Sequence, residues 1–155
     1  MVVGLLAAGA ALALETGDTF GSWAVRCSTA QGSPSSRCHL FQNLIQKQAK
    51  KRVLRISVGY GQESGKPLII LDLPLGIWLP SGAQLQIDNH EPQRMPIQRC
   101  TLGGCRASAN LDMDMIRRLQ KGEQLTVTVY SGERQKVVLP VPLDGFGAGF
   151  RALSQ

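Results

Sequence analysis

The stretch Cys100-Thr101-Leu102-Gly103-Gly104-Cys105 sets two cysteines around four residues, two of which are glycine. A run of polar and apolar residues precedes it from 93 to 100, and another follows it from 106 to 111. This pattern predicts a β-hairpin whose tip is closed by a disulfide. We interpret the rest of the chain as strands packed around hairpins of this kind.

The composition favours a single domain rich in strands and turns. The 155 residues suffice for one domain of ordinary size, and hydrophobic residues make up 43% of them. Aromatic residues amount to only 5%, so valine, isoleucine and leucine must fill most of the core. The 17 glycines and 8 prolines suit many turns and few long helices.

Alternation of apolar and polar residues locates the strands. Trp23 and Val25 alternate with polar or small neighbours, so Trp23 is expected to face the core. A bulge near Gln42-Asn43 would explain a slip in the next strand. The continuous apolar run 68–71 suggests burial on both faces of its strand. Strands are expected over residues 20–28, 37–48, 53–60, 68–71, 84–88, 93–100, 106–111, 125–130 and 136–141.

One or two short helices accompany these strands. Asp112 can cap a helix over 112–120, and Gly122 can end it. A second short helix is expected over 146–153, where Phe146 and Phe150 can pack. The sequence therefore predicts an all-β protein with helices near 112–120 and 146–153.

The N-terminal segment suggests export. Residues 1–14 carry no charge, and Ala11-Leu12-Ala13 fits a secretory cleavage site, so residues 1–13 are expected to be a cleaved signal peptide. The usual basic start is missing, so the true start of the peptide stays open. A helix of 14 residues spans roughly 21 Å, short of the ~30 Å hydrocarbon core. We expect a periplasmic, cell-surface or secreted protein, or a membrane-anchored one if the segment is retained with more apolar residues ahead of it.

In an oxidising compartment four cysteines suggest two disulfides. We expect the pairs Cys27–Cys38 and Cys100–Cys105, because each would join the ends of two adjoining strands. A zinc site is the alternative, but the spacings contain no Cys-x-x-Cys knuckle. No metal and no cofactor are expected.

Positive charge is concentrated in one part of the chain. The net charge is +6, and between Asp18 and Glu63 there are seven basic residues and no acidic one. Such a patch attracts lipid headgroups, lipopolysaccharide, acidic polysaccharide or nucleic acid. The alternative is a solvated strand edge that lysines protect from aggregation. The expected partner-binding residues are Arg37, Lys47, Lys50, Lys51, Arg52 and Arg55.

No motif in the chain implies a reaction. His39 and His90 fall in different elements, and neither has a ligand partner two or four residues on. The segment 61–67 resembles a phosphate loop, but Pro67 stands where that motif needs serine or threonine to hold magnesium. No Gly-x-Ser-x-Gly elbow occurs. We expect no enzymatic activity and assign no catalytic residues.

Several segments in order resemble the invasion-associated locus B (IalB) family of Gram-negative envelope proteins. The segments are residues 20–27 (FGSWAVRC) with Cys38, Pro74-Leu75-Gly76 with Gly82 and 85–88 (LQID), Cys100 with Gly104-Cys105, and 141–146 (VPLDGF) with Ala148 and Leu153. The resemblance covers about residues 18–153. Ser22 stands where the family often has aspartate before the tryptophan.

The resemblance implies an exported, disulfide-containing antiparallel β-sandwich over residues 18–153, without agreed catalytic residues. Some family members are linked to entry into host cells, and a general envelope role is the broader expectation. Our leading hypothesis is an interaction module that meets an envelope or membrane protein, or an anionic envelope polymer, through the basic hairpin. Membrane-surface association fits the same patch, and nucleic acid is not expected. The alternatives are an accessory subunit of a larger membrane complex and a small-ligand binder with a cleft near Trp23 or Trp78.

Overall fold

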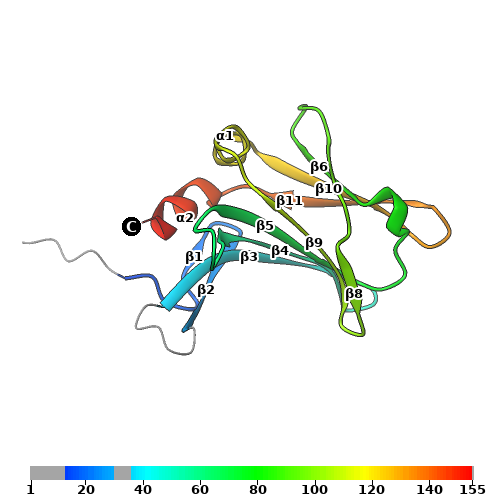
Figure 1. The fold of residues 1–155 in the computed structure, drawn as a ribbon, viewed down its shortest axis with the longest axis horizontal. Helices are drawn as coiled ribbons and strands as arrows, with labels where there is room; N and C mark the ends of the chain where they lie inside the picture. Colours follow the sequence, from blue (N-terminus) through cyan, green and yellow to red (C-terminus); the bar gives the residue numbers. More distant parts are fainter. Residues whose placement is uncertain (1–12, 30–35, 155) are drawn as a thin grey trace, which may run out of the picture.

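Two antiparallel sheets face each other in this chain (Figure 1), of which the computed structural model describes residues 13–29 and 36–154. The larger sheet has the spatial order β1 (Thr19–Phe20), β2 (Trp23–Thr29), β3 (Ser36–Gln46), β4 (Lys51–Tyr60), β5 (Pro67–Leu73), β9 (Gly104–Asn110) and β8 (Arg99–Thr101). The smaller sheet has the order β11 (Lys136–Pro142), β10 (Gln124–Tyr130), β6 (Ala83–Ile87) and β7 (Gln93–Met95). The predicted β-sandwich is confirmed.

The helices are α1 (Met113–Lys121), α2 (Phe146–Leu153) and the 3-10 helix η1 (Leu79–Ser81). Asp112 caps α1 as expected, because its carboxylate accepts a hydrogen bond from the backbone N–H of Met115 at 2.7 Å. In α2 the rings of Phe146 and Phe150 stack at 5.6 Å, and Phe146 meets Trp23 edge-on at 5.1 Å. Both helices lie toward the same end of the sandwich (Figure 1).

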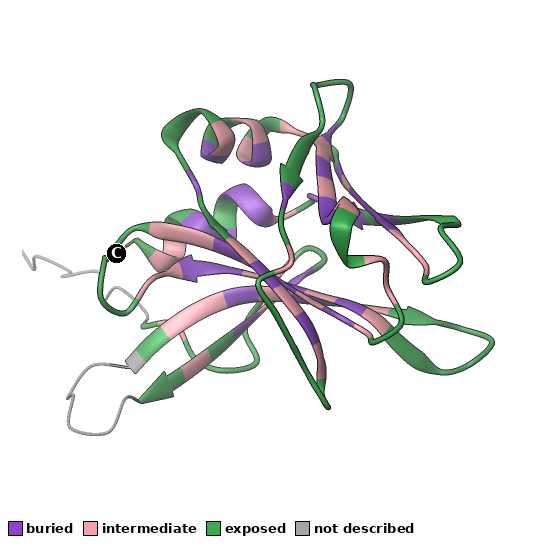
Figure 2. Ribbon diagram, turned by 45° about the vertical axis from the view of Figure 1, so that its right-hand side comes forward, coloured by how far each residue is buried: buried purple, intermediate pink, exposed green. Residues whose placement is uncertain are grey.

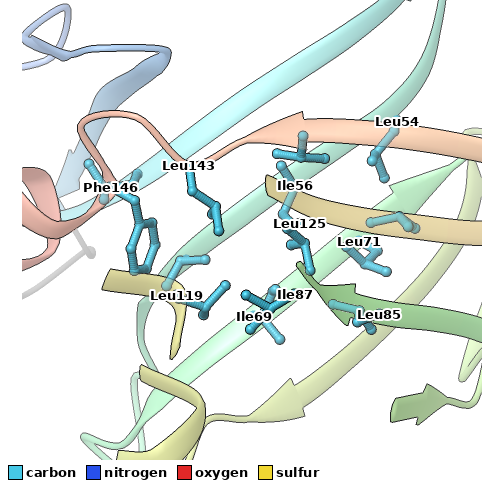
Figure 3. Close-up of a cluster of buried hydrophobic side chains, with 14 of the residues drawn as sticks. Leu54, Ile56, Ile69, Leu71, Leu85, Ile87, Leu119, Leu125, Leu143 and Phe146 are labelled. Carbon is cyan, nitrogen blue, oxygen red and sulfur yellow. The ribbon is translucent and has the colours of Figure 1, made fainter. Parts of the chain in front are cut away.

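The core lies between the two sheets (Figure 3). Alternate residues of each strand point inward, so buried residues alternate with partly buried or exposed ones along the strands (Figure 2). Leu54 and Leu71 of the larger sheet lie opposite Leu85 and Leu125 of the smaller one (Figure 3). Trp23 faces this core as predicted and is 1% exposed.

The expected single strand over 93–100 is wrong. Residues 93–95 form β7 and pair with β6 of the smaller sheet, whereas residues 99–101 form β8 and pair with β9 of the larger sheet. Pro96 follows β7 directly and has no N–H to donate to a ladder. The chain therefore leaves one layer at Pro96 and joins the other at Arg99.

Two further strand expectations also need correction. The register between β3 and β4 shifts at Leu44/Ile45, two residues later than expected, and Val53 is the extra residue. Inward and outward side chains alternate along β3 without a break at Gln42, because this polar residue occupies an inward position. Within the run 68–71 of β5, Ile69 and Leu71 are buried but Leu68 and Ile70 are only partly buried, so the run is not buried on both faces.

Both expected disulfides are present. Cys27–Cys38 joins β2 to β3 and Cys100–Cys105 joins β8 to β9, each between directly opposed residues. All four cysteines are therefore oxidised, which excludes the zinc alternative for them. Among the described residues, no helix is long and apolar enough to cross a membrane.

Candidate functional site: a basic face of the larger sheet

The face of the larger sheet that points away from the smaller one carries rows of basic side chains. The residues that alternate with the core positions point to this outer face. In one row Arg26 of β2 lies opposite His39 of β3. In a second row the order across four strands is Arg55, Asp72, Arg106 and Arg99.

A hollow of about 480 Å³ lies on this face, and we call it the arginine hollow. Its floor is made of small residues at outward positions, among them Ser57 and Gly59. Gly59 pairs with Leu68 and has no side chain to fill the space beside His39. A Cβ atom at Gly59 would lie 2.8 Å from the His39 Cβ, closer than real Cβ contacts. The basic residues that line the hollow are Arg26, Arg37, His39, Arg55 and Arg106.

The charges in the arginine hollow are unbalanced. Asp72 is the one carboxylate among the described lining residues, and it accepts a hydrogen bond from Arg106 Nε at 2.7 Å. This bond raises the pKa of the Arg106 guanidinium. Arg55 lies over the ring of Phe41, 4.5 Å from its centroid, and burial followed by the charges of Arg26 and Arg52 lowers the pKa of Arg55. The hollow thus holds more positive charge than Asp72 neutralises.

His39 lies half-buried among these arginines. Loss of hydration lowers the pKa of His39 from its ordinary value of 6.5, and the positive charges of Arg55 and Arg26 lower it further. Its ring therefore favours the neutral form, which offers one hydrogen-bond donor and one acceptor. A bound anion would oppose the effect of the arginines and favour the protonated form.

A second hollow of about 660 Å³ opens at the end of the sheet where β4 and β9 begin, and we call it the tip hollow. It lies between the start of β4 and the closed β8–β9 hairpin, and Leu75 and Leu102 are among its lining residues. The two hollows share Arg55, Asp72 and Arg106. The basic residues that line the tip hollow are Lys51, Arg52, Arg55, Arg99 and Arg106.

The residues expected to form one hairpin patch are spread along the sheet. Arg37 lies at the far end of β3, where its Nη1 donates to the Gln62 carbonyl at 3.0 Å. Arg55 lines both hollows, and Lys51 with Arg52 lines only the tip hollow. Lys47 and Lys50 are exposed on the β3–β4 turn, outside both hollows.

Sequence reasoning missed Arg26, His39, Arg99 and Arg106 as site residues. All four directly flank a disulfide. Because Cys27 lies opposite Cys38, the residue before the first and the residue after the second must also face each other. The same holds for Arg99 and Arg106 around Cys100–Cys105. The disulfide pairing, which was predicted correctly, would therefore have been enough to predict that Arg26 faces His39 and that Arg99 faces Arg106.

Guanidinium groups, a neutral imidazole and small hydroxyl residues suit the binding of oxyanions. Arginine presents fixed pairs of N–H donors that match phosphate, sulfate and carboxylate oxygens. No group of three or more metal-ligating side chains occurs among residues 13–29 and 36–154. A ligand cleft at Trp23 is disfavoured because Phe146 fills the adjacent space, and Trp78 is covered by Arg134 at 4.5 Å.

Together these features define a disulfide-closed β-sandwich with a basic outer face. The family profile described as "Invasion associated locus B (IalB) protein" matches residues 23–154, and the chain belongs to this family.

Similar proteins agree with this assignment. Two proteins from Brucella abortus, strain 2308 and biovar 1 strain 9-941, each named as an invasion protein B homolog, are 28% identical over 132 residues. These matches cover 84% of this chain and 75% of each relative. A crystal structure of invasion associated protein b from Bartonella henselae superposes with a TM-score of 0.76 at 23% identity. It covers 88% of this chain and 93% of the other, and it shows a shared fold.

Proposed function

We propose that this IalB family protein is an exported, non-enzymatic envelope protein that binds an anionic partner through the basic outer face of its larger sheet. The observation that supports it best is the arginine hollow, whose single described carboxylate is already bound to Arg106. The apolar N-terminal sequence and the two disulfides support export to an oxidising compartment. The family description names an association with invasion and no reaction.

The partner in this proposal is an envelope polymer or protein that carries phosphate, sulfate or carboxylate groups. Arg26, Arg37 and Arg55 come from three adjacent strands, so a rigid sheet fixes their spacing. Little backbone ordering is then needed on binding, which favours affinity. Arg55 is partly buried, so salt screens its charge less than it screens the charge of an exposed lysine, whereas Arg26 and Arg37 are exposed.

A polyanion binding assay tests the proposal. Fluorescent heparin serves as a sulfated probe and lipopolysaccharide as a phosphorylated one, with uncharged dextran as the blank. We expect the triple variant Arg26→Gln, Arg37→Gln, Arg55→Gln to bind both probes roughly tenfold or more weakly, because each arginine supplies charge-assisted hydrogen bonds. The matched control removes three charges from α1 and β11 by Arg117→Gln, Lys121→Gln and Lys136→Gln.

Equal losses in the two triple variants would overturn the assignment, because net charge alone would then explain binding. A variant that keeps every charge sharpens the test. Gly59→Ala places a methyl group against the His39 Cβ and raises the floor of the hollow there, so it should weaken binding of both probes. If this variant does not fold, Ser57→Val fills the same floor from the neighbouring outward position.

A further inference from the structure

We propose that the end of the larger sheet at the tip hollow docks onto an anionic lipid surface and inserts Leu102 into it. The inference rests on the export to the envelope that the proposed function includes, but it names a lipid bilayer as a second anionic partner. The tip hollow shares only Arg55, Asp72 and Arg106 with the arginine hollow. The sheet tip consists of the β3–β4 turn, the segment 74–76 that follows β5, and the β8–β9 hairpin. Strand order brings these three segments to one end of the sheet (Figure 1).

Exposed apolar side chains gather at this tip. Leu102 is 100% exposed at the end of the β8–β9 hairpin, Leu75 is 53% exposed and Ile45 is 52% exposed. Leu75 and Leu102 line the same hollow, and Ile45 lies opposite Arg52 in the neighbouring strand pair. Large apolar side chains that project together into water indicate a contact surface.

The hairpin that carries Leu102 is held rigidly. Cys100–Cys105 closes it, the Thr101 hydroxyl accepts a hydrogen bond from the Gly103 N–H at 3.3 Å, and Gly104 lies directly against the Leu73 carbonyl. These constraints act on the backbone of the turn, so little loop ordering is needed when Leu102 enters a lipid surface. Leu102 is thus preorganised for shallow insertion.

Basic side chains surround the apolar ones. Five basic residues lie on the tip, namely Lys47, Lys50, Lys51, Arg52 and Arg99. The nearby acidic residues are Asp72, which is bound to Arg106, and Glu133, which is next to Arg134 on the β10–β11 turn. That turn contacts segment 74–76 through a hydrogen bond from the Gly132 N–H to the Gly76 carbonyl at 2.7 Å. The tip therefore complements a negatively charged surface.

A bilayer fits this combination better than a soluble polyanion does. Apolar residues with flanking lysine and arginine match the boundary between acyl chains and anionic headgroups. A hydrated polymer could neutralise the lysines but offers no apolar region for Leu102. The tip hollow has a volume of about 660 Å³, enough to hold a headgroup phosphate, and its lining residues include Arg52, Arg99 and Leu102.

Vesicle co-sedimentation of the full chain provides the first test. Vesicles of phosphatidylglycerol and phosphatidylethanolamine are compared with phosphatidylcholine vesicles. We expect Leu102→Ser to weaken partitioning into the anionic vesicles about tenfold, from the lost burial of one leucine. Neutralising Lys47, Lys50, Lys51 and Arg52 with glutamine should cost roughly fivefold per charge. The control Val138→Ser removes an exposed apolar residue from β11.

A site-specific probe separates tip docking from binding through the apolar N-terminal sequence. The fluorescence of the tryptophan introduced by Leu102→Trp should be quenched by brominated acyl chains when anionic vesicles are added. The fluorescence of the tryptophan introduced by Val138→Trp should not be quenched. Equal quenching at both positions, or equal partitioning of the two serine variants, would overturn the proposal. So would equal binding to neutral vesicles.

The outcomes also distinguish the two proposals. Leu102→Ser leaves the arginine hollow intact and should bind heparin like the unmodified chain. The triple arginine variant keeps Leu102 and the lysines of the tip, so it should retain quenching at position 102 when combined with Leu102→Trp. Loss of heparin binding with normal vesicle docking would support both assignments, whereas loss of both activities in both variants would contradict separate surfaces.

Discussion

Gln42 shows how one buried polar side chain can join distant parts of the chain. Its Nε2 donates to the Pro142 carbonyl at 2.7 Å, and Trp23 Nε1 donates to the same oxygen at 3.2 Å. Pro142 is the last residue of β11, so these bonds tie the smaller sheet to β2 and β3 of the larger one. A polar residue in an inward position is tolerated because its hydrogen bond is made.

The variant Gln42→Leu should lower the free energy of unfolding by about 1 to 3 kcal/mol, because it removes a buried hydrogen bond to the Pro142 carbonyl. Urea denaturation at neutral pH measures the change. The control Asn43→Leu replaces the exposed neighbour and should change stability by less than about 0.5 kcal/mol. Equal stability of the two variants would contradict a structural role for the bond.

His39 should make stability depend on pH in a definite direction. Its folded-state pKa is lowered by burial, then by Arg55 and Arg26, from an ordinary value of 6.5. As pH falls through 6.5 the unfolded chain takes up a proton that the folded chain does not, so stability falls. The loss stops growing once pH passes below the folded-state value, and above 6.5 the group contributes no pH dependence.

Denaturation midpoints measured from pH 8 to pH 5.5 check this expectation, since most carboxylates titrate at about pH 4. In His39→Gln the decline in stability below pH 6.5 should become smaller. The decline should also become smaller in Arg26→Gln, because the positive charge of Arg26 then no longer opposes protonation of His39. A steeper decline in His39→Gln than in the unmodified chain would contradict a lowered pKa of His39 in the folded state.

At the scale of elements, the β8–β9 hairpin depends on its disulfide. The hairpin is short, and among the strands of residues 13–29 and 36–154 β8 pairs with β9 alone, at the edge of its sheet. Replacing both Cys100 and Cys105 with alanine should lower the free energy of unfolding by about 2 kcal/mol, from the chain entropy of a six-residue loop.

Denaturation of the double variant beside the unmodified chain measures this loss, with Thr101→Ala as a control in the same loop. A loss below about 1 kcal/mol would mean that the hairpin keeps its shape without the covalent bond. The same variant should also dock to anionic vesicles more weakly than the unmodified chain, because Leu102 is then less well ordered.

Local sequence patterns predicted most elements because each element has its own local signal. Asp112 and Gly122 bound α1 within a residue of the expected limits, and α2 begins at Phe146 as expected. The run 93–100 failed because alternation alone does not tell which sheet a strand joins. The register shift between β3 and β4 was misplaced because Gln42 is polar yet points inward, and its hydrogen bond to Pro142 explains that position.

At the scale of the whole molecule, the sandwich buries some leucine side chains and leaves others exposed. Leu71 lies fully buried between the sheets, whereas Leu102 in the turn between β8 and β9 is fully exposed. Leu71→Ala should lower the free energy of unfolding by about 2 to 5 kcal/mol, through lost burial and a cavity. Leu102→Ala should change it by less than about 0.5 kcal/mol.

Thermal or urea unfolding of these two variants makes the comparison directly, and each serves as the control of the other. Similar losses would contradict the exposed position of Leu102. In the vesicle assay the order is expected to reverse, because Leu102 contributes to docking and Leu71 contributes to the core.

The sequence by itself determined the β-rich class, both disulfides, the two helices and the family. The family came from the resemblance of several segments in order, and the other features depend on local periodicity, capping residues and cysteine spacing, which are all readable along the chain. The sequence also located the basic segment that contains no acidic residue. The partner-binding residues expected there were Arg37, Lys47, Lys50, Lys51, Arg52 and Arg55.

Only the tertiary structure decided how these charges are grouped. Strand pairing places Arg26 opposite His39, and it adds Arg106 and Arg99, which are distant in sequence, to the same sheet. Arg37, in contrast, lies away from the β3–β4 turn by the length of β3. The physical reason is that a sheet joins residues through register between strands and places alternate side chains on opposite faces. Residues that are adjacent in sequence therefore point to opposite faces, whereas Arg26 and Arg106, which are 80 positions apart in the sequence, line the same hollow.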